Sequence, residues 1–403
     1  MNCELAPVVV VSDALAGGAA AAANNLVDGL AEQELFCERW HFTSARRETS
    51  VSEFSLDTRS KRPSFERLIK NVHRSWADNL RRRRHEAAFF RRLDQVRPRI
   101  LNVHNIHGCG LNHDSLSRVP IETPIIWTLH DCWPFKAEAF EWWNSSRGET
   151  ESTAVDQPES LARRRRLHFF ETRPSVFWVA PSRWMEAEFA RHASNSTRVF
   201  HIPYGIDCER FAPIHREKAR AVVGVDDKRV WIGCGATWAS TRKGLDLLPD
   251  ALKGISEIPL GLLLWGEAPK CEWPAGLDVR VIGRVDSSEK LSTLYSACDL
   301  FVCPSRADNL PNTVLESLSC GTPVVGSRAG GISDMVRPGS SGWLFSEDTP
   351  SSFEGAIREA LANKNGWNDL RQTCRKIACS EYSIALQAKR YLELFTEIQN
   401  TRQ

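Results

Sequence analysis

The sequence predicts an α/β protein made of two doubly wound domains, each with a parallel sheet. Short apolar runs of strand length alternate with longer segments that have a helical pattern. Parallel strands with helical crossovers are covered on both faces, so they read as continuous apolar runs. The alternation occurs in two series, and 403 residues are enough for two domains of ordinary size.

The first series contains five apolar runs, and each is predicted to be a strand. They are APVVVVSDA, ILNVHNI, PIIWTLH, SVFWVAPS and TRVFHIPYG. The first run leads into a helix-prone segment of small residues, GGAAAAANNLVDGLAEQ. The stretch from about Ser50 to Arg99 is polar, basic and helical in pattern, which indicates an insertion.

The second series begins after about residue 215 and contains six runs. They are KRVWIGCGA, GLLLWG, DVRVIGRV, DLFVCPS, TPVVGS and GWLF. Pro203, Gly205 and Pro213 lie between the two series and mark the joint.

These patterns predict a first domain over residues 1–205 and a second over residues 206–382. A last helix is expected from roughly Ser383 to Gln399, after the second series has ended. In a two-lobed protein this helix would cross back, so that residues 383–403 pack on the first domain.

Composition indicates an ordinary globular protein and excludes several classes. The net charge is +2, from 52 basic and 50 acidic residues, and no recognition motif accompanies the arginine runs, so nucleic-acid binding is not expected. The 12 cysteines are dispersed without a CxxC pair, which favours a reducing cytosol over a disulfide framework or zinc site. No apolar stretch is long enough to span a membrane, and the N-terminus lacks the pattern of a signal peptide.

In open parallel sheets, ligands bind beyond the carboxyl ends of the strands, so residues that follow the apolar runs are candidates. Gly17 and Gly18 follow the first run and begin a helix, where a phosphate or sugar could approach the backbone. The pattern is not GxGxxG, and no acid ends a second strand at the expected offset. A dehydrogenase-type dinucleotide site is therefore disfavoured, and a plain tight turn remains an alternative.

Histidines follow two further runs of the first series. His130 and Asp131 follow PIIWTL, and His104 and His107 follow ILNV. A histidine at a strand end can polarise a hydroxyl or hold a sugar, although a structural hydrogen bond is the more common role. No set of histidine and acidic residues has metal-ligand spacing, so no metal is expected in the chemistry.

Two candidate groups follow strands of the second series. Arg242 and Lys243 lie in a strand-to-helix loop and offer the positive charge that a diphosphate needs. Asp308 follows DLFVCPS, and Glu316 lies about a turn and a half into the next helix, with Pro311 expected in its first turn. Two ionised acids in one crevice would accept hydrogen bonds from two polyols, whereas the alternative is a capping Asp and a solvated Glu.

The stretch PSRADNLPNTVLESLSCGTPVVGSRAGGISDMV resembles the donor-binding segment of the retaining family-4 glycosyltransferases of the GT-B fold. LYSACDLFVCPS, IPYGIDCERFAP and VAPSRW are similar to further blocks of that family. VSDALAGGAAAAANNLVDGL and TLHDCWPF look most like its capsular and extracellular polysaccharide branch, the colanic-acid type. The resemblance covers about residues 5–45 and 100–400.

The resemblance implies roles on the donor side. Glu316 would hold the nucleotide ribose, Asp308 the hydroxyls of the donor sugar, and Lys243, joined by Arg242, the diphosphate. The backbone around Arg284 would meet the base. Asn309 and Leu310, beside Asp308, are further expected donor-binding residues.

The resemblance also implies roles in the first domain. Gly17 and Gly18 match the glycine loop that faces the diphosphate, and His130 matches the histidine near the anomeric centre. His104, His107 and Asp131 are the acceptor-side candidates.

The sequence departs from the family pattern at four places. Asp308 stands where the family has Glu, Trp238 where it has a donor-lobe Arg, and Ala21 where an Arg often follows the glycines. The segment KAEAFEWWNSSRGE lacks the cysteines that the branch often has, which bears on acceptor recognition.

The implied activity is metal-independent, retaining hexosyl transfer from a nucleoside diphosphate sugar to a glycan or lipid-linked hydroxyl acceptor. The alternatives are a sugar-nucleotide 2-epimerase of the same fold and a degenerate sugar-nucleotide-binding protein. NLRRRRHEAAFFRRL and LARRRRLHFF mix arginines with aromatics on expected first-domain helices. They are either solvated faces or a surface that docks on anionic lipid. The docking alternative predicts a cytoplasmic protein at the inner face of the membrane.

Overall fold

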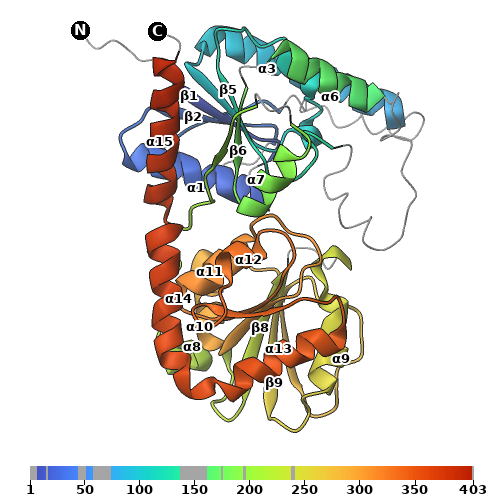
Figure 1. Cartoon of the computed structure of the whole chain (residues 1–403), viewed down its shortest axis with the longest axis vertical. Helices are drawn as coiled ribbons and strands as arrows, with labels where there is room; N and C mark the ends of the chain where they lie inside the picture. The colour runs from blue at the N-terminus through green and yellow to red at the C-terminus, as the bar shows by residue number, and fades with distance from the viewer. Residues whose placement is uncertain are drawn as a thin grey trace, which may run out of the picture. The chain divides into compact units, whose positions relative to one another are not determined.

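A computed structural model of the chain contains two compact units. The structure describes residues 7–14, 17–43, 51–57, 74–136, 161–173, 176–193, 197–236 and 241–401. One unit comprises Met1–Pro181, Met185–Ile202 and Gln387–Gln403, and the other comprises Ser182–Trp184 and Pro203–Leu386. Both are α/β units built on parallel sheets (Figure 1).

The first unit contains a seven-stranded parallel sheet in the order β3-β2-β1-β4-β5-β6-β7. The strands are β1 Val8–Val11, β2 Cys37–His41, β3 Ser52–Ser55, β4 Ile100–Val103, β5 Ile125–Thr128, β6 Phe177–Ala180 and β7 Val199–His201. The five strands expected from apolar runs are confirmed, because central parallel strands bury both faces of the backbone.

Strands β2 and β3 were not predicted. β2 has the sequence CERWH, and its charged residues do not form the apolar run that predicts a buried strand. Arg39 is nevertheless 0% exposed and lies beside Val10 of β1. Its guanidinium is satisfied by hydrogen bonds, among them one of 2.5 Å from Nη2 to the Ser12 hydroxyl. β3 is a short edge strand, so the expectation of an insertion beginning at about Ser50 is wrong for these four residues.

Helices cover both faces of this sheet (Figure 1). They are α1 Gly18–Glu32, α3 Arg74–Val96, α4 His113–Ser117, α6 Leu161–Thr172 and α7 Arg183–Ala190, with a 3₁₀ turn η1 at His107–Cys109. On one face, Phe89 of α3 packs on Trp40, and Phe169 of α6 packs on Trp127 and Trp178.

The C-terminal helix α15, Ile384–Asn400, packs on the opposite face of the first sheet (Figure 1). Tyr391 and Leu394 belong to the core cluster that contains Val8 and Val10, and the Tyr391 hydroxyl lies 2.8 Å from Thr128 Oγ1. The expected return of this helix to the first domain is confirmed.

The second unit contains a six-stranded parallel sheet in the order β10-β9-β8-β11-β12-β13. The strands are β8 Val230–Ala236, β9 Leu260–Gly266, β10 Asp278–Gly283, β11 Leu300–Cys303, β12 Val324–Ser327 and β13 Gly342–Phe345. All six were expected from apolar runs. The helices are α8 Arg216–Val223, α9 Leu248–Lys253, α10 Ser288–Ala297, α11 Asn312–Ser319, α12 Ile332–Met335, α13 Pro350–Ala362 and α14 Trp367–Glu381, with 3₁₀ turns η2 Thr241–Lys243, η3 Leu245–Leu247 and η4 Lys364–Gly366.

Both sheets have the strand order of a doubly wound fold, and the predicted fold class is confirmed. The order reverses between β1 and β4 in the first unit and between β8 and β11 in the second. Ligands of such sheets bind at this reversal, beyond the carboxyl ends of the strands. Within the described part of the chain, no helix combines the length and apolar character that a membrane crossing requires.

Candidate functional site

The reversal point of the second unit brings together three residues that the sequence singled out. Lys243 Nζ lies 2.6 Å from Asp308 Oδ2, and Arg242 Nη1 lies 3.8 Å from the same oxygen. Arg242 also donates a 2.7 Å hydrogen bond to the Ala307 carbonyl. The loop after β8 and the loop after β11 therefore form one cluster of two cations and an acid, which is called the cation–Asp308 cluster below.

Asp308 is ionised in this cluster. Burial works to raise the pKa of its carboxyl, but Lys243 and then Arg242 outweigh burial and hold the pKa below its usual value of 3.8. The side chain is 14% exposed, so the ion pair is partly screened from water while it remains open to a ligand. Asp308 does not cap the following helix, which has no side-chain cap.

Glu316 is the fifth residue of α11 and accepts a hydrogen bond from a residue that the sequence did not single out. The Tyr295 hydroxyl of α10 donates to Glu316 Oε2 at 2.8 Å. Burial raises the pKa of Glu316 to about 7, and the hydrogen bond from Tyr295 opposes that rise. The interpretation of Glu316 as a solvated surface acid is therefore wrong.

The start of α11 differs by one residue from the prediction. Pro311 has φ −65° and ψ 121° and is the N-cap, so the helix begins at Asn312. Asn309 and Leu310 precede it and are both 3% exposed.

A glycine turn packs directly against the Asp308 backbone. Gly330 has φ +57°, and a Cβ atom there would lie 1.7 Å from the Asp308 carbonyl oxygen. The next residue, Gly331, donates its N–H to that oxygen at 3.2 Å. This glycine turn therefore supports the loop of the cation–Asp308 cluster.

Arg306 is a second residue that sequence reasoning missed. Its side chain is 6% exposed and forms ion pairs with Asp246, at 2.5 Å, and Asp348, at 2.7 Å. It also donates to the Thr241 carbonyl at 2.6 Å, and its backbone N–H donates to Arg242 O at 2.8 Å. Arg306 thus joins the loop after β8 to the loop after β11 from outside the cluster.

The Arg284 side chain is not brought to the cluster. It is 68% exposed and pairs with Asp286 at 2.9 Å, at the exit of the edge strand β10. The expectation that the backbone near Arg284 meets a base stays a prediction.

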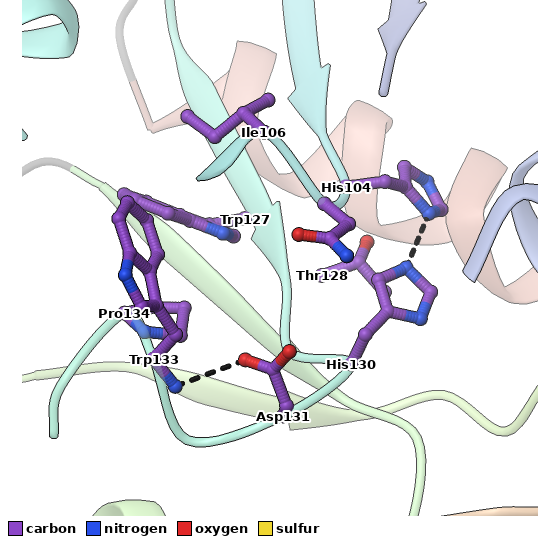
Figure 2. Close-up of a pocket in the computed structure, with 9 residues that line it drawn as sticks. His104, Ile106, Trp127, Thr128, His130, Asp131, Trp133 and Pro134 are labelled. Atoms are coloured by element: carbon purple, nitrogen blue, oxygen red, sulfur yellow. Dashed lines mark hydrogen bonds between the residues drawn. The ribbon is translucent and has the colours of Figure 1, made fainter. Parts of the chain in front are cut away.

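The first unit brings together two histidines at the ends of adjacent strands (Figure 2). His104 Nδ1, after β4, lies 2.7 Å from His130 Nε2, after β5. His104 is 1% exposed. Burial first, and then His130 and Arg39, hold the pKa of His104 well below 6.5, so its ring is neutral.

A small pocket lies beside this pair (Figure 2). Asp131 borders it, and its carboxylate Oδ1 accepts the Trp133 backbone N–H at 2.9 Å. The indole of Trp133 stacks on His113, with ring centroids 5.3 Å apart. The residues that line the pocket are His104, Asn105, Ile106, Trp127, Thr128, His130, Asp131, Trp133 and Pro134. The pocket thus brings together an aromatic wall, an acid and an imidazole.

Gly17 and Gly18 form the start of α1. Gly17 is the N-cap, with φ +100°, a conformation that favours glycine, and its carbonyl accepts the Ala21 N–H at 2.8 Å. The preceding chain is held by Arg39, which donates to the Ala14 carbonyl at 3.1 Å. A 15-residue helix with no acid in its first turn presents a positive end.

Several expectations concern parts of the chain that the structure does not describe. They are the side chain of His107, Trp238, and nearly all of the segment KAEAFEWWNSSRGE. Among the described residues, no cluster of three or more His, Cys, Asp or Glu side chains is arranged to hold a metal ion.

Two glycosyltransferase family models match the chain, one in each series of strands. Residues 16–210 match Glycosyltransferase Family 4, and residues 228–363 match Glycosyl transferases group 1. A GDP-mannose-dependent alpha-mannosyltransferase of Corynebacterium glutamicum is 27% identical over 217 residues, or 50% of each chain. The lipopolysaccharide core biosynthesis mannosyltransferase LpsB of Rhizobium meliloti is 29% identical over 46% of this chain and 59% of its own. The chain spans about half the length of the curated relatives it matches.

Solved structures match over nearly the whole chain and support the fold. Sucrose-phosphate synthase of Thermosynechococcus elongatus aligns with a TM-score of 0.71 and 18% identity, over 98% of this chain and 99% of its own. Anabaena HepE, solved in complex with UDP and glucose, aligns with a TM-score of 0.71 and 14% identity, over 98% and 100%. At these identities the likeness establishes the two-domain, Rossmann-like GT-B fold and no more.

Proposed function

We propose that this protein is a retaining glycosyltransferase that moves a hexose from a nucleoside diphosphate sugar to a hydroxyl of a glycan or lipid-linked acceptor. The observation that carries the proposal is the cation–Asp308 cluster at the reversal point between β8 and β11. Two glycosyltransferase family models support the reaction class, and the names of relatives in lipopolysaccharide core biosynthesis support a role in cell-surface polysaccharide assembly.

In this proposal, Lys243 exchanges its carboxylate partner for the diphosphate of the donor. Its ammonium and the Arg242 guanidinium would stabilise the charge that develops on the leaving diphosphate. Asp308, released from Lys243, would accept hydrogen bonds from hydroxyls of the donor sugar. The positive charge that these side chains supply motivates the proposal of metal-independent transfer, which activity in excess EDTA would test.

Glu316 would hold the ribose of the nucleotide. The pKa of Glu316 is about 7 without a ligand. Hydroxyls that donate hydrogen bonds to the carboxylate would stabilise its charged form, so ligand binding would lower this pKa and ionise the group. The Tyr295 hydroxyl already occupies Oε2 and orients the carboxyl. The donor is a UDP or GDP sugar in this proposal. HepE, which has a similar fold, was solved with UDP, and the similar mannosyltransferase of Corynebacterium glutamicum is GDP-mannose-dependent by name.

Retention is proposed through attack of the acceptor hydroxyl on the face that the diphosphate leaves. The acceptor proton would pass to the leaving phosphate oxygen, so the carbon–oxygen bond to the diphosphate breaks as the bond to the acceptor forms. No protein nucleophile takes part in this scheme. Gly17, Gly18, His130 and Asp131 would contribute the first unit's contacts to diphosphate, sugar and acceptor.

The test combines a donor screen with a matched pair of variants. A panel of nucleotide sugars is first screened by thermal shift, and the stabilising donor is then assayed for release of nucleoside diphosphate with and without glycan acceptors. Lys243→Ala is expected to abolish turnover, whereas Lys253→Ala, an exposed lysine of the same unit, leaves it unchanged. Acceptor-independent release of a free sugar would favour the 2-epimerase, and donor binding without turnover would favour a non-catalytic binding protein.

Association with the cytoplasmic face of a membrane is proposed for the arginine-rich helices. Arg81, Arg82, Arg83 and Arg84 of α3 are consecutive exposed residues. In α6, Arg164 is exposed next to the exposed Leu161 and Leu167, whereas Arg165 pairs with Asp114 and Arg166 is buried. An arginine beside exposed leucines fits an anionic lipid surface.

Sedimentation with vesicles tests this docking. Binding is expected to phosphatidylglycerol-containing vesicles at low salt, to fall as salt screens the charges, and to weaken in Leu161→Asp. Equal sedimentation with neutral phosphatidylcholine vesicles, or none with either kind, would contradict the proposal.

A further inference from the structure

We propose that His104 is a positioning residue that fixes His130 as its Nδ1–H tautomer, so that His130 Nε2 accepts a hydrogen bond and is closed to proton abstraction. The tautomer itself follows from the geometry of the first unit, whereas its consequence for catalysis rests on the proposed function. The two imidazoles and the Asp131 carboxylate are drawn together in Figure 2.

The contact between the two rings requires one donor and one acceptor. His104 Nδ1 and His130 Nε2 are 2.7 Å apart, a full hydrogen bond between ring nitrogens. A neutral imidazole has one N–H and one lone pair, so the nitrogen that faces the other ring determines the state of the remaining nitrogen. Two arrangements are therefore open: either His104 donates from Nδ1 or His130 donates from Nε2.

The surroundings of His104 decide between them. His104 is 1% exposed, and its other nitrogen, Nε2, is buried and has no hydrogen-bond partner among the residues that the structure describes. If His130 donated, the single proton of His104 would sit on this isolated Nε2, and isolated buried N–H groups are rare and costly. If His104 donates from Nδ1, its isolated Nε2 carries a lone pair and no proton. Proteins leave a buried acceptor unsatisfied more readily than a buried donor. The low pKa of His104 is consistent with a neutral ring in either case.

The consequence reaches the residue expected near the anomeric carbon. With Nε2 of His130 engaged as an acceptor, the proton of its neutral ring lies on Nδ1. His130 then acts as a hydrogen-bond donor towards its own surroundings and not as a general base through Nε2. This agrees with a transfer in which the leaving phosphate oxygen takes the acceptor proton.

Nitrogen-15 NMR of the full chain with labelled histidine reads out the tautomer directly, because protonated and unprotonated ring nitrogens have different shifts and couplings. The chain contains its own references. His113 Nε2 lies 2.7 Å from the Pro134 carbonyl, and His85 Nδ1 lies 3.0 Å from the Cys109 carbonyl. Carbonyls only accept, so His113 must be the Nε2–H form, while His85 carries a proton on Nδ1.

At neutral pH, His104 and His130 are expected to share the Nδ1–H pattern and to differ from His113. Signals are assigned from the spectra of His104→Asn and His130→Asn. An Nε2–H signal for His130, or a doubly protonated His104, would overturn the proposal. This measurement needs no turnover, so its outcome is independent of whether the protein proves to be a glycosyltransferase.

Variants of His104 separate positioning from mere packing. Asn keeps a donor near the position of Nδ1, whereas Leu fills the space without one. His104→Asn is expected to keep the Nδ1–H signal of His130 and most of the transfer rate. His104→Leu is expected to give His130 a mixture of tautomers and to lower kcat by about 10-fold or more, with donor KM little changed. An unchanged His130 signal and unchanged kcat in a folded His104→Leu protein would contradict the proposal.

Discussion

The half-buried carboxyl of Glu316 gives a stability prediction that can be worked out from the structure. Replacing Glu316 by Gln removes a group whose pKa is raised from 4.5 to about 7 in the folded protein, while it keeps the hydrogen-bond acceptor for Tyr295. One pKa unit corresponds to about 1.4 kcal/mol, so this difference corresponds to about 3 kcal/mol at most.

The sign follows from which state binds more protons. Between pH 4.5 and about 7 the folded protein holds the proton on Glu316 and the unfolded chain does not. The contribution of this group to stability is therefore fully present below the unfolded pKa and is lost as pH rises through the folded pKa. The free energy of unfolding of wild type should fall over this window relative to that of Glu316→Gln.

Urea unfolding of the two proteins at about pH 5 and about pH 8 measures this difference. The advantage of Glu316→Gln over wild type is expected to grow between the two pH values by about 1–3 kcal/mol. Glu272→Gln, at an exposed position of the same unit, is the matched control and should show no such growth. An advantage of Glu316→Gln that is the same at both pH values would refute the raised pKa of this half-buried carboxyl.

Three further predictions concern the cation–Asp308 cluster. Gly330→Ala should lower the free energy of unfolding by about 2–4 kcal/mol, because its Cβ would collide with the Asp308 carbonyl. Gly339 also has a positive φ, +76°, but open space around the position of a Cβ, so Gly339→Ala should lower that free energy by only about 1 kcal/mol. Equal losses of the two variants in urea unfolding would contradict this account. Arg306→Ala should cost about 1–3 kcal/mol and lower kcat for transfer, because the loop after β8 and the loop after β11 are no longer held together. Arg306→Lys should recover only part of either loss, since an ammonium cannot replace the two nitrogens that pair with Asp246 while it also pairs with Asp348; full recovery of kcat by Lys would show that charge alone matters. Asp308→Glu lengthens the acid by one carbon and should change the ranking of donor sugars by kcat/KM while it keeps the pair with Lys243; an unchanged ranking would mean that this carboxyl does not contact the sugar.

The sequence pattern was enough to identify the strands that are continuous apolar runs. Every predicted apolar run is a strand, because a parallel strand covered on both faces must be apolar throughout. Cys37–His41 was not predicted because its one buried arginine donates hydrogen bonds to residues distant in the sequence, and no local pattern records such partners. Ser52–Ser55 was not predicted because this exposed edge strand has no apolar face that a sequence pattern could indicate.

The sequence by itself determined the fold class and the places where the candidate side chains would emerge, because parallel strands put their carboxyl ends on one edge of a sheet. Only the tertiary structure decided which of these side chains meet. His104 pairs with His130 across 26 residues, Tyr295 with Glu316 across 21, and Lys243 with Asp308 across 65. Each contact depends on how adjacent strands and helices pack. That same packing sets the desolvation that raises the pKa of Glu316 to about 7, while Asp308, beside two cations, stays ionised.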